Sequence, residues 1–197
     1  LEIIYKPYLN KALTVEDYDQ MLGVCPHVLL QQYKKVYPRE EGRSGVNYIA
    51  FELTKELINN FLNTEKSLIA QGNRLKIIAL EEKFSIPVNH PKLDFPIQLK
   101  GVVDRIDQWN DTIRIVDYKT GAVVKKDLYI SELEALLTST EKGTLFQVLV
   151  YAYVFKDRFL HYHRFQAGVI SFRSFENSFL EFSFRQGLSK VTPVFLN

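Results

Sequence analysis

The sequence of 197 residues contains a single cysteine, Cys25, and no long hydrophobic run. One cysteine excludes an internal disulfide, and it excludes any zinc or iron–sulfur site built from several cysteines of this chain. We expect Cys25 to be a buried thiol, which suits a reducing compartment. No stretch approaches the ~20 apolar residues that a membrane-spanning helix needs, so no membrane association is predicted. The chain opens at Leu1 rather than at a methionine and is interpreted as a fragment.

The sequence also lacks an excess of charge of either sign. Its 25 basic and 23 acidic residues give a formal charge of +2, which by itself does not indicate a nucleic-acid binder. The hydrophobic fraction of 46% and the charged fraction of 24% are typical of a folded globular protein and argue against disorder. Together with the cysteine content, this composition predicts a cytoplasmic globular protein.

The first 74 residues are predicted to be a helical segment of the same domain as the rest of the chain. Thr14, followed three residues later by Asp17, is typical of a helix start. Pro26, Pro38 and Gly42 are expected to break the stretch that follows. Apolar residues at helical spacing then predict a long helix over 46–70.

Residues 75–197 are predicted to form the core of an α/β fold. The hydrophobic period changes to two after residue 75, and the alternation of strands with helices favours a mixed central sheet flanked by helices. The expected strands are 75–88, interrupted at Pro87, then 97–107 and 113–119 around a turn at 109–112, and finally a hairpin of 167–175 and 179–184 around 176–177. The expected helices are 128–138 and an aromatic one over 145–159.

The predicted hairpin places two carboxylates face to face. If its turn is centred between Asn110 and Asp111, Asp104 lies directly opposite Asp117, with Cβ atoms ~5 Å apart. Lys119 is two residues further along and therefore lies on the same face. The rest of this face is apolar, with Val102, Ile106, Ile113 and Ile115. On the other face Asp107 is opposite Arg114, where an ion pair is expected.

Two carboxylates in an apolar wall cannot both ionise cheaply, so the pKa of one of them should rise. A divalent cation would remove the conflict, and carboxylate oxygens with waters suit Mg²⁺ or Mn²⁺. Lys119 would then stabilise negative charge on a phosphoryl oxygen or position a water molecule. The alternative is a salt-bridged hairpin in which Lys119 neutralises Asp117 and nothing reacts.

Three ordered motifs resemble those of the PD-(D/E)XK nuclease superfamily. Residues 101–107 read GVVDRID, residues 116–121 read VDYKTG, and residues 146–151 read FQVLVY. The resemblance is closest to the RecB/AddB-like branch, with its pattern GxxDRxD, DYKTG and QxxxY, and it covers residues 75 to about 184. Gln147 and Tyr151 are four residues apart and share one helix face.

The resemblance implies a restriction-endonuclease-like core and a metal-dependent DNA nuclease that uses Mg²⁺ or Mn²⁺. Asp104 and Asp117 would be metal ligands, joined by the carbonyl of Tyr118, and Lys119 would be the catalytic lysine. Gln147 and Tyr151 would approach the same site from their helix. The resemblance also implies that the chain is part of a helicase–nuclease or recombination-repair protein. Its partners would be DNA and a helicase or another subunit. The alternative is a nuclease-like module that binds DNA or has an architectural role but no longer cuts.

Some features of the family are missing or ambiguous in this chain. The four-cysteine iron–sulfur cluster of many AddB-like relatives is not expected, because only Cys25 is present. A metal-binding histidine is expected just before Leu1, since His27, His90, His161 and His163 are poor replacements. Strand alternation favours Glu82 as the inward acidic residue, whereas family spacing favours Glu81, and both stay open. The candidates for DNA contact are Arg105, Lys125, Lys126, Arg158, Arg164, Arg173 and Arg185.

Overall fold

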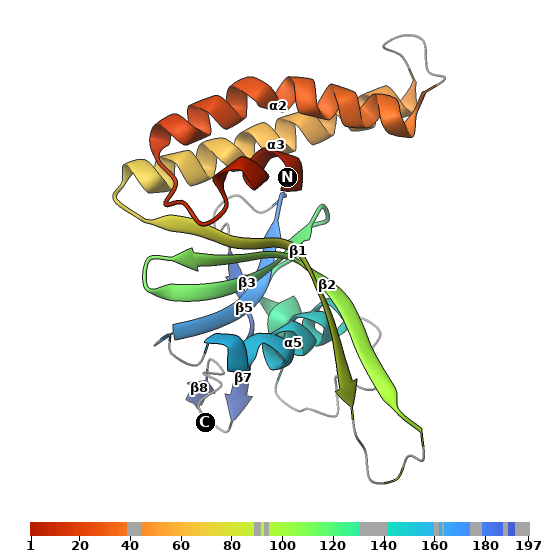
Figure 1. Cartoon of the computed structure of the whole chain (residues 1–197), viewed down its shortest axis with the longest axis vertical. Helices are drawn as coiled ribbons and strands as arrows, with labels where there is room; N and C mark the ends of the chain where they lie inside the picture. Colours follow the sequence, from red (N-terminus) through yellow and green to blue (C-terminus); the bar gives the residue numbers. More distant parts are fainter. Residues whose placement is uncertain are drawn as a thin grey trace.

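A five-stranded mixed sheet lies between a layer of helices and one further helix (Figure 1). The computed structural model describes residues 1–38, 45–88, 92, 95–130, 142–159, 162, 164–173, 179–186 and 189–191. The covering layer consists of α1 (Glu2–Tyr5), α2 (Val15–Val36) and α3 (Val46–Ala70), and α5 (Gly143–Phe155) lies against the opposite face. In the described part of the chain, no helix is long and apolar enough to cross a bilayer.

The sheet has the strand order β1-β2-β3-β5-β6. Its strands are β1 (Leu75–Val88), β2 (Ile97–Trp109), β3 (Thr112–Lys119), β5 (Arg164–Ser171) and β6 (Leu180–Glu181). β1, β2 and β3 are antiparallel, β3 and β5 are parallel, and β5 and β6 are antiparallel again. This confirms the predicted mixed sheet with flanking helices and an N-terminal helical segment.

Shorter elements complete the described structure. A second, three-stranded sheet is formed by β4 (Tyr129–Ile130), β7 (Ser183–Gln186) and β8 (Ser189–Val191). Single 3₁₀ turns occur at η1 (Lys6–Tyr8), η2 (Lys125–Leu128) and η4 (Lys156–Phe159). The prediction of a helix over 128–138 is wrong at its start, because Leu128 is the last residue of η2 and β4 follows it. Residues 131–138 lie outside the described residues, as do Gly42 and the turn expected at 176–177.

Two prolines that were expected to interrupt elements do not. Pro26 lies inside α2, which continues because Tyr18, Met21 and Cys25 on its inner face are buried in the core. Pro87 lies within β1 and pairs in register with Gln98. A proline is tolerated there because β1 is an edge strand, whose outer side needs no ladder hydrogen bond. Other predictions are confirmed: Thr14 and Asp17 form a capping box, and α3 spans the expected 46–70.

Each face of the sheet has its own hydrophobic core. Ile106, Ile113 and Ile115 pack with α5, in a cluster that includes Val148 and Tyr151. On the other face, Leu75, Ile77, Val116 and Ile170 pack with residues of α1, α2 and α3. Because alternate residues of β2 and β3 point to opposite faces, neighbouring residues of one motif enter different environments.

Candidate functional site

The β2–β3 hairpin has the predicted register. Arg105 pairs with Val116, Ile106 with Ile115 and Asp107 with Arg114, while Asn110 adopts a left-handed conformation (φ 52°) in the turn. The ladder ends one residue before Asp104 and Asp117. Beyond the last ladder pair, Oδ2 of the Asp104 side chain accepts a hydrogen bond of 2.7 Å from the backbone N–H of Tyr118. Asp104 is therefore fixed at the end of β3.

Asp117 is a buried carboxylate beside a lysine. It is 3% exposed, and its Oδ2 lies 2.8 Å from Nζ of Lys119. Burial raises the pKa of Asp117, Lys119 offsets part of that rise, and the nearby Asp104 adds to it. The contact with Lys119 is an ion pair rather than a well-oriented hydrogen bond, and no described group donates a hydrogen bond to this buried oxygen.

Lys119 is joined to α5 by a short chain of hydrogen bonds. Its Nζ donates to Oε1 of Gln147 (3.0 Å), and Nε2 of Gln147 donates to the hydroxyl of Tyr151 (2.6 Å). Tyr151 is 6% exposed, and burial raises the pKa of its phenol. The structure thus brings five of the predicted site residues into one connected group: Asp104, Asp117, Lys119, Gln147 and Tyr151.

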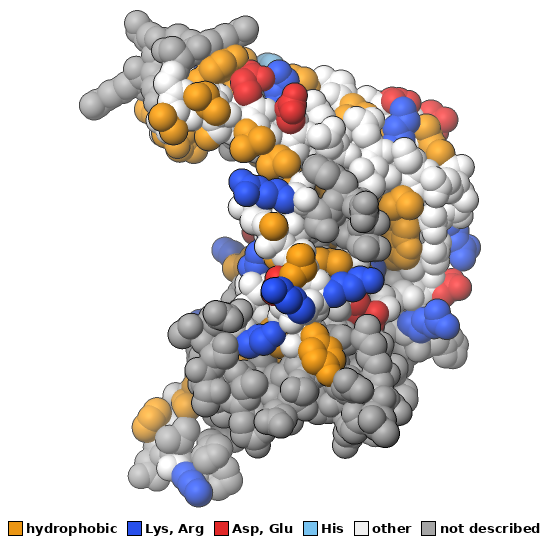
Figure 2. Space-filling view, turned by 180° about the vertical axis from the view of Figure 1, so that it is seen from behind, with side chains coloured by type: hydrophobic (Ala, Val, Ile, Leu, Met, Phe, Trp, Pro, Cys, Tyr) orange, Lys and Arg blue, Asp and Glu red, His pale blue; other side chains and the backbone are white. Residues whose placement is uncertain are grey.

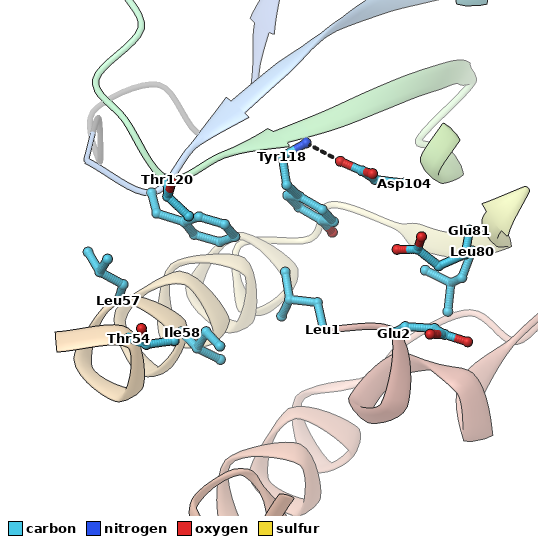
Figure 3. A pocket seen from close by; sticks show the side chains of 11 residues that line it. Leu1, Glu2, Thr54, Leu57, Ile58, Leu80, Glu81, Asp104, Tyr118 and Thr120 are labelled. Carbon is cyan, nitrogen blue, oxygen red and sulfur yellow. Dashed lines mark hydrogen bonds between the residues drawn. The ribbon is translucent and has the colours of Figure 1, made fainter. Parts of the chain in front are cut away.

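A cavity of about 270 Å³ opens beside Asp104 (Figure 3). Its acidic side is formed by Glu2, Glu81 and Asp104. Its apolar wall includes Ile58 of α3 and Phe172, which follows β5. The cavity therefore lies between the helical layer and the sheet, and it combines negative charge with apolar surface.

Glu81, and not Glu82, lies at this cavity. Glu81 is between the ladder pairs Leu80–Arg105 and Glu82–Val103, so it is beside Asp104 across the two strands. Burial raises the pKa of Glu81, and the charges of Asp104 and Glu2 raise it further. Glu82 instead forms an ion pair of 2.7 Å with Arg158.

The inward position predicted by strand alternation was Glu82, and the backbone explains the difference. The β1–β2 register shifts at a bulge between Ile77 and Ala79, and Glu81 has a φ of 49°. A non-glycine residue in the left-handed region is strained, and such strain is concentrated at functional sites. Simple alternation does not hold across a strand that is interrupted in this way.

The oxygen donors at this site fit a hard divalent cation. Asp104 and Asp117 supply carboxylates, of which the Asp117 Oδ2 is buried without a hydrogen bond. A buried carboxylate needs positive charge beside it, and Mg²⁺ or Mn²⁺ prefers oxygen ligands. Within the described residues, however, no group of three or more His, Cys, Asp or Glu side chains is arranged to hold a metal ion.

Arg105 was predicted as a DNA contact, and the structure shows that this was wrong. Its guanidinium is 0% exposed and donates to Glu65 Oε1 (2.8 Å), to Asp107 Oδ2 (2.6 Å) and to the Tyr118 hydroxyl (2.8 Å). It faces the helical layer, where the carboxylate of Glu65 from α3 holds it. The expected ion pair of Asp107 with Arg114 is confirmed, at 2.8 Å.

Glu65 of α3 is the residue that sequence reasoning missed. It is 2% exposed and accepts hydrogen bonds from Tyr5 (2.5 Å), Tyr18 (2.9 Å) and Arg105. One carboxylate thus joins α1, α2 and α3 to β2. The signal available in the sequence was an acidic residue four positions after Phe61, on the apolar face of the predicted helix.

The remaining predicted residues have less prominent positions. The Tyr118 ring stacks on Phe172, with ring centroids 5.5 Å apart. His27 is exposed, and its Nε2 lies 2.8 Å from the amide nitrogen of Gln31. The other three histidines lie outside the described residues.

Comparison with protein families identifies a relationship that covers most of the chain. A family model described as the PD-(D/E)XK nuclease superfamily matches residues 7–180. A search of curated proteins found no match. The matched range contains α2, α3 and every residue of the connected group around Asp117.

Proposed function

Because the chain belongs to the PD-(D/E)XK nuclease superfamily, we propose that it hydrolyses phosphodiester bonds of DNA with Mg²⁺ or Mn²⁺ as cofactor. The observation that carries the proposal is the buried Asp117 carboxylate, 2.8 Å from Lys119 and next to Asp104 at the end of the hairpin. A structural salt bridge does not need a second carboxylate that makes the first harder to ionise.

The proposed metal ligands are Asp104, Asp117 and the backbone carbonyl of Tyr118. When bound there, a divalent cation would lower the pKa of a water molecule and offset the negative charge of the phosphoryl group. Asp104 is held for this role by its bond to the Tyr118 N–H. Asp117 must be ionised to bind a cation, and its raised pKa makes the site sensitive to acid.

Lys119 is proposed to stabilise the charge that develops on a phosphoryl oxygen. A fixed cation in a partly buried site acts more strongly than one in bulk water. Lys119 is held between Asp117 and Gln147, so its ammonium group is oriented before a substrate binds. Tyr151 fixes the orientation of the Gln147 amide through the 2.6 Å bond. Glu81 is proposed as a further acidic residue of the site because it lines the cavity with Asp104.

Cleavage of a labelled DNA strand by the purified chain with MgCl₂ tests this function. We expect cleavage by the wild type and none by Asp117→Ala or Lys119→Ala. Asp111→Ala and Lys66→Ala are the matched controls, since both remove a charge on the surface away from this group. Full activity in both site variants would show that the proposal is wrong.

A second candidate is a nuclease-like module that binds DNA or has an architectural role without cutting. It is favoured by the lack of a three-residue metal cluster among the described residues. Calorimetric titration with MnCl₂ separates the two functions. An active site should bind Mn²⁺ in a way that Asp104→Ala abolishes, whereas an inactive module should show no binding that depends on Asp104.

The finer assignment is also a proposal. The three motifs at residues 101–107, 116–121 and 146–151 support a RecB/AddB-like nuclease of a helicase–nuclease or recombination-repair protein. On this basis, a helicase or another repair subunit is the proposed partner and the cytoplasm the proposed location. The division into a helical segment over 1–74 and a nuclease core over 75–197 belongs to the same proposal.

A further inference from the structure

The far halves of β1 and β2 form a two-stranded ribbon that projects beyond the sheet (Figure 1). β2 pairs with β3 only from Arg105 to Trp109, whereas its pairing with β1 continues to Ile97. Residues 82–88 of β1 and 97–103 of β2 therefore pair only with each other, and we call them the ribbon. A two-stranded ribbon in water is marginally stable unless one of its faces is packed.

One face of the ribbon is anchored to α5 and to the 3₁₀ turn that follows it. The Phe84 ring makes edge contacts with Tyr151 and Phe155, with centroids 5.8 Å and 5.9 Å apart. Gly101 lies beneath that ring, and a Cβ atom there would be 2.6 Å from Phe84. Glu82 adds its ion pair with Arg158. The orientation of the ribbon is thus fixed relative to the candidate site.

The other face of the ribbon carries two exposed lysines. Lys83 pairs in register with Val102, and Ser85 pairs with Lys100. The two lysines are therefore diagonal neighbours across the ribbon, with Cα atoms about 7–8 Å apart. Neither forms an ion pair with a described residue, although Lys6, Lys11, Lys55, Lys66 and Arg74 all do. Two adjacent like charges repel each other unless an anion lies between or over them.

This face leads directly to the candidate site. Glu81 precedes Lys83 by two residues and, like Lys83, Ser85 and Pro87, is exposed on β1. Asp104 follows Lys100 by four residues, and side chains two or four apart on a strand share a face. In Figure 2 several Lys and Arg side chains lie on the middle of the molecule, below the projecting end of α2 and α3.

We propose that the lysine-bearing face of the ribbon binds the phosphodiester backbone of the nucleic acid whose scissile bond lies at Asp104 and Asp117. The inference rests on the proposed function for the identity of the substrate. The backbone supplies closely spaced negative charges, and each lysine that neutralises one releases a condensed counterion. The contact is independent of base sequence, so it positions the substrate and does not select it.

The competing explanation is that the lysines only protect an exposed edge. Lysines on edge strands commonly prevent pairing with other chains, and they then bind nothing. The two explanations differ in what salt does to nucleic-acid binding. Lysines that contact phosphates add to the salt dependence of the affinity, whereas protective lysines do not.

The test compares Lys83→Gln/Lys100→Gln with the matched double variant Lys66→Gln/Arg74→Gln. Both lose two positive charges, but Lys66 and Arg74 pair with Asp19 and Asp111 near the other end of β1. Affinity of the full chain for a fluorescein-labelled 20-nucleotide DNA strand, and for its duplex, is measured against KCl concentration. EDTA is present so that no cleavage occurs, and thermal unfolding checks that each variant is folded.

For the ribbon variant we expect the slope of log affinity against log salt to become shallower by about 1.8 with the duplex and about 1.4 with the single strand. Its affinity in 50 mM KCl should fall about tenfold or more. The control variant should keep the wild-type slope. An unchanged slope in a folded Lys83→Gln/Lys100→Gln variant would overturn the inference, even if Asp117→Ala abolishes cleavage. A reduced slope with no cleavage by the wild type would support the ribbon and refute the nuclease activity.

Discussion

Lys119 donates a hydrogen bond of 3.0 Å to Gln147, and this bond joins the end of β3 to α5. The lysine also forms an ion pair of 2.8 Å with Asp117, so its ammonium group lies between a carboxylate and a neutral hydrogen-bond acceptor. Gln147 in turn is held by Tyr151, which is buried in the core beneath α5. The position of the Lys119 ammonium group therefore depends on α5, whose Gln147 lies 28 residues further along the sequence.

Gln147→Met should lower the DNA cleavage rate by about 10- to 100-fold. The substitution keeps the side-chain length nearly constant but removes the hydrogen-bond acceptor that positions Lys119. Tyr151→Phe should have a smaller effect in the same direction, since Gln147 keeps its bond to Lys119 and loses only its own support. Tyr153→Phe is the control, on the exposed side of the same helix. Single-turnover cleavage rates check this, and a wild-type rate for Gln147→Met would contradict it.

Glu81→Gln should reduce both cleavage and the affinity for Mn²⁺, whereas Glu82→Gln should change neither. The two residues are adjacent in β1, but only Glu81 lines the cavity with Asp104, and Glu82 pairs with Arg158. Neutralising Glu81 removes negative charge that would attract a cation. Cleavage assays and calorimetry on both variants check this. Equal losses in the two variants would show that the cavity does not define the site.

The sequence was sufficient to predict the centre of the hairpin. Asn110 in the turn and the alternation on both sides of it determine the register, and the register places Asp104 opposite Asp117. Gln147 and Tyr151 could be paired because four residues make one turn of a helix. These inferences use only local geometry.

What could not be predicted depends on tertiary contacts. The position of Glu81 follows from a bulge and a left-handed residue, which strand alternation does not reveal. Arg105 was a candidate for DNA contact, but a buried carboxylate from α3 holds it inside. Pro26 does not end α2 because packing of the inner face outweighs one lost hydrogen bond.

Glu65→Ala should lower the free energy of unfolding by about 3–5 kcal/mol, because it leaves the buried Arg105 guanidinium without its partner from α3. Two tyrosine hydroxyls lose their acceptor as well. Arg74→Ala breaks an exposed ion pair with Asp111 and should cost about 1 kcal/mol or less. Urea unfolding of both variants checks the contrast. A Glu65→Ala variant as stable as Arg74→Ala would mean that the buried network contributes no stability.

Asp117→Asn and Asp107→Asn should change stability in opposite directions at pH 7. Burial raises the pKa of Asp117 above its usual 3.8 despite Lys119, so the folded state holds its proton more tightly than the unfolded chain. This contribution is fully present below pH 3.8 and is lost as the pH rises through the raised value. Without metal, Asp117→Asn should therefore melt above the wild type at pH 7, with no difference near pH 3. Each unit of pKa corresponds to about 1.4 kcal/mol, and 1 kcal/mol to about 2–4 °C.

Asp107 provides the contrast on the other face of the same hairpin. Burial alone would raise its pKa, but Arg114 and Arg105 lower it below 3.8. Its contribution to stability is present above pH 3.8 and is lost as the pH falls through the lowered value. Asp107→Asn should therefore cost about 3–5 kcal/mol at pH 7, and this difference from the wild type should shrink only in strong acid. Melting curves in EDTA from pH 3 to 8 check both variants. If Asp117→Asn melts below the wild type at pH 7, Asp117 is a stabilising partner of Lys119, and the salt-bridged hairpin is the correct description of this site.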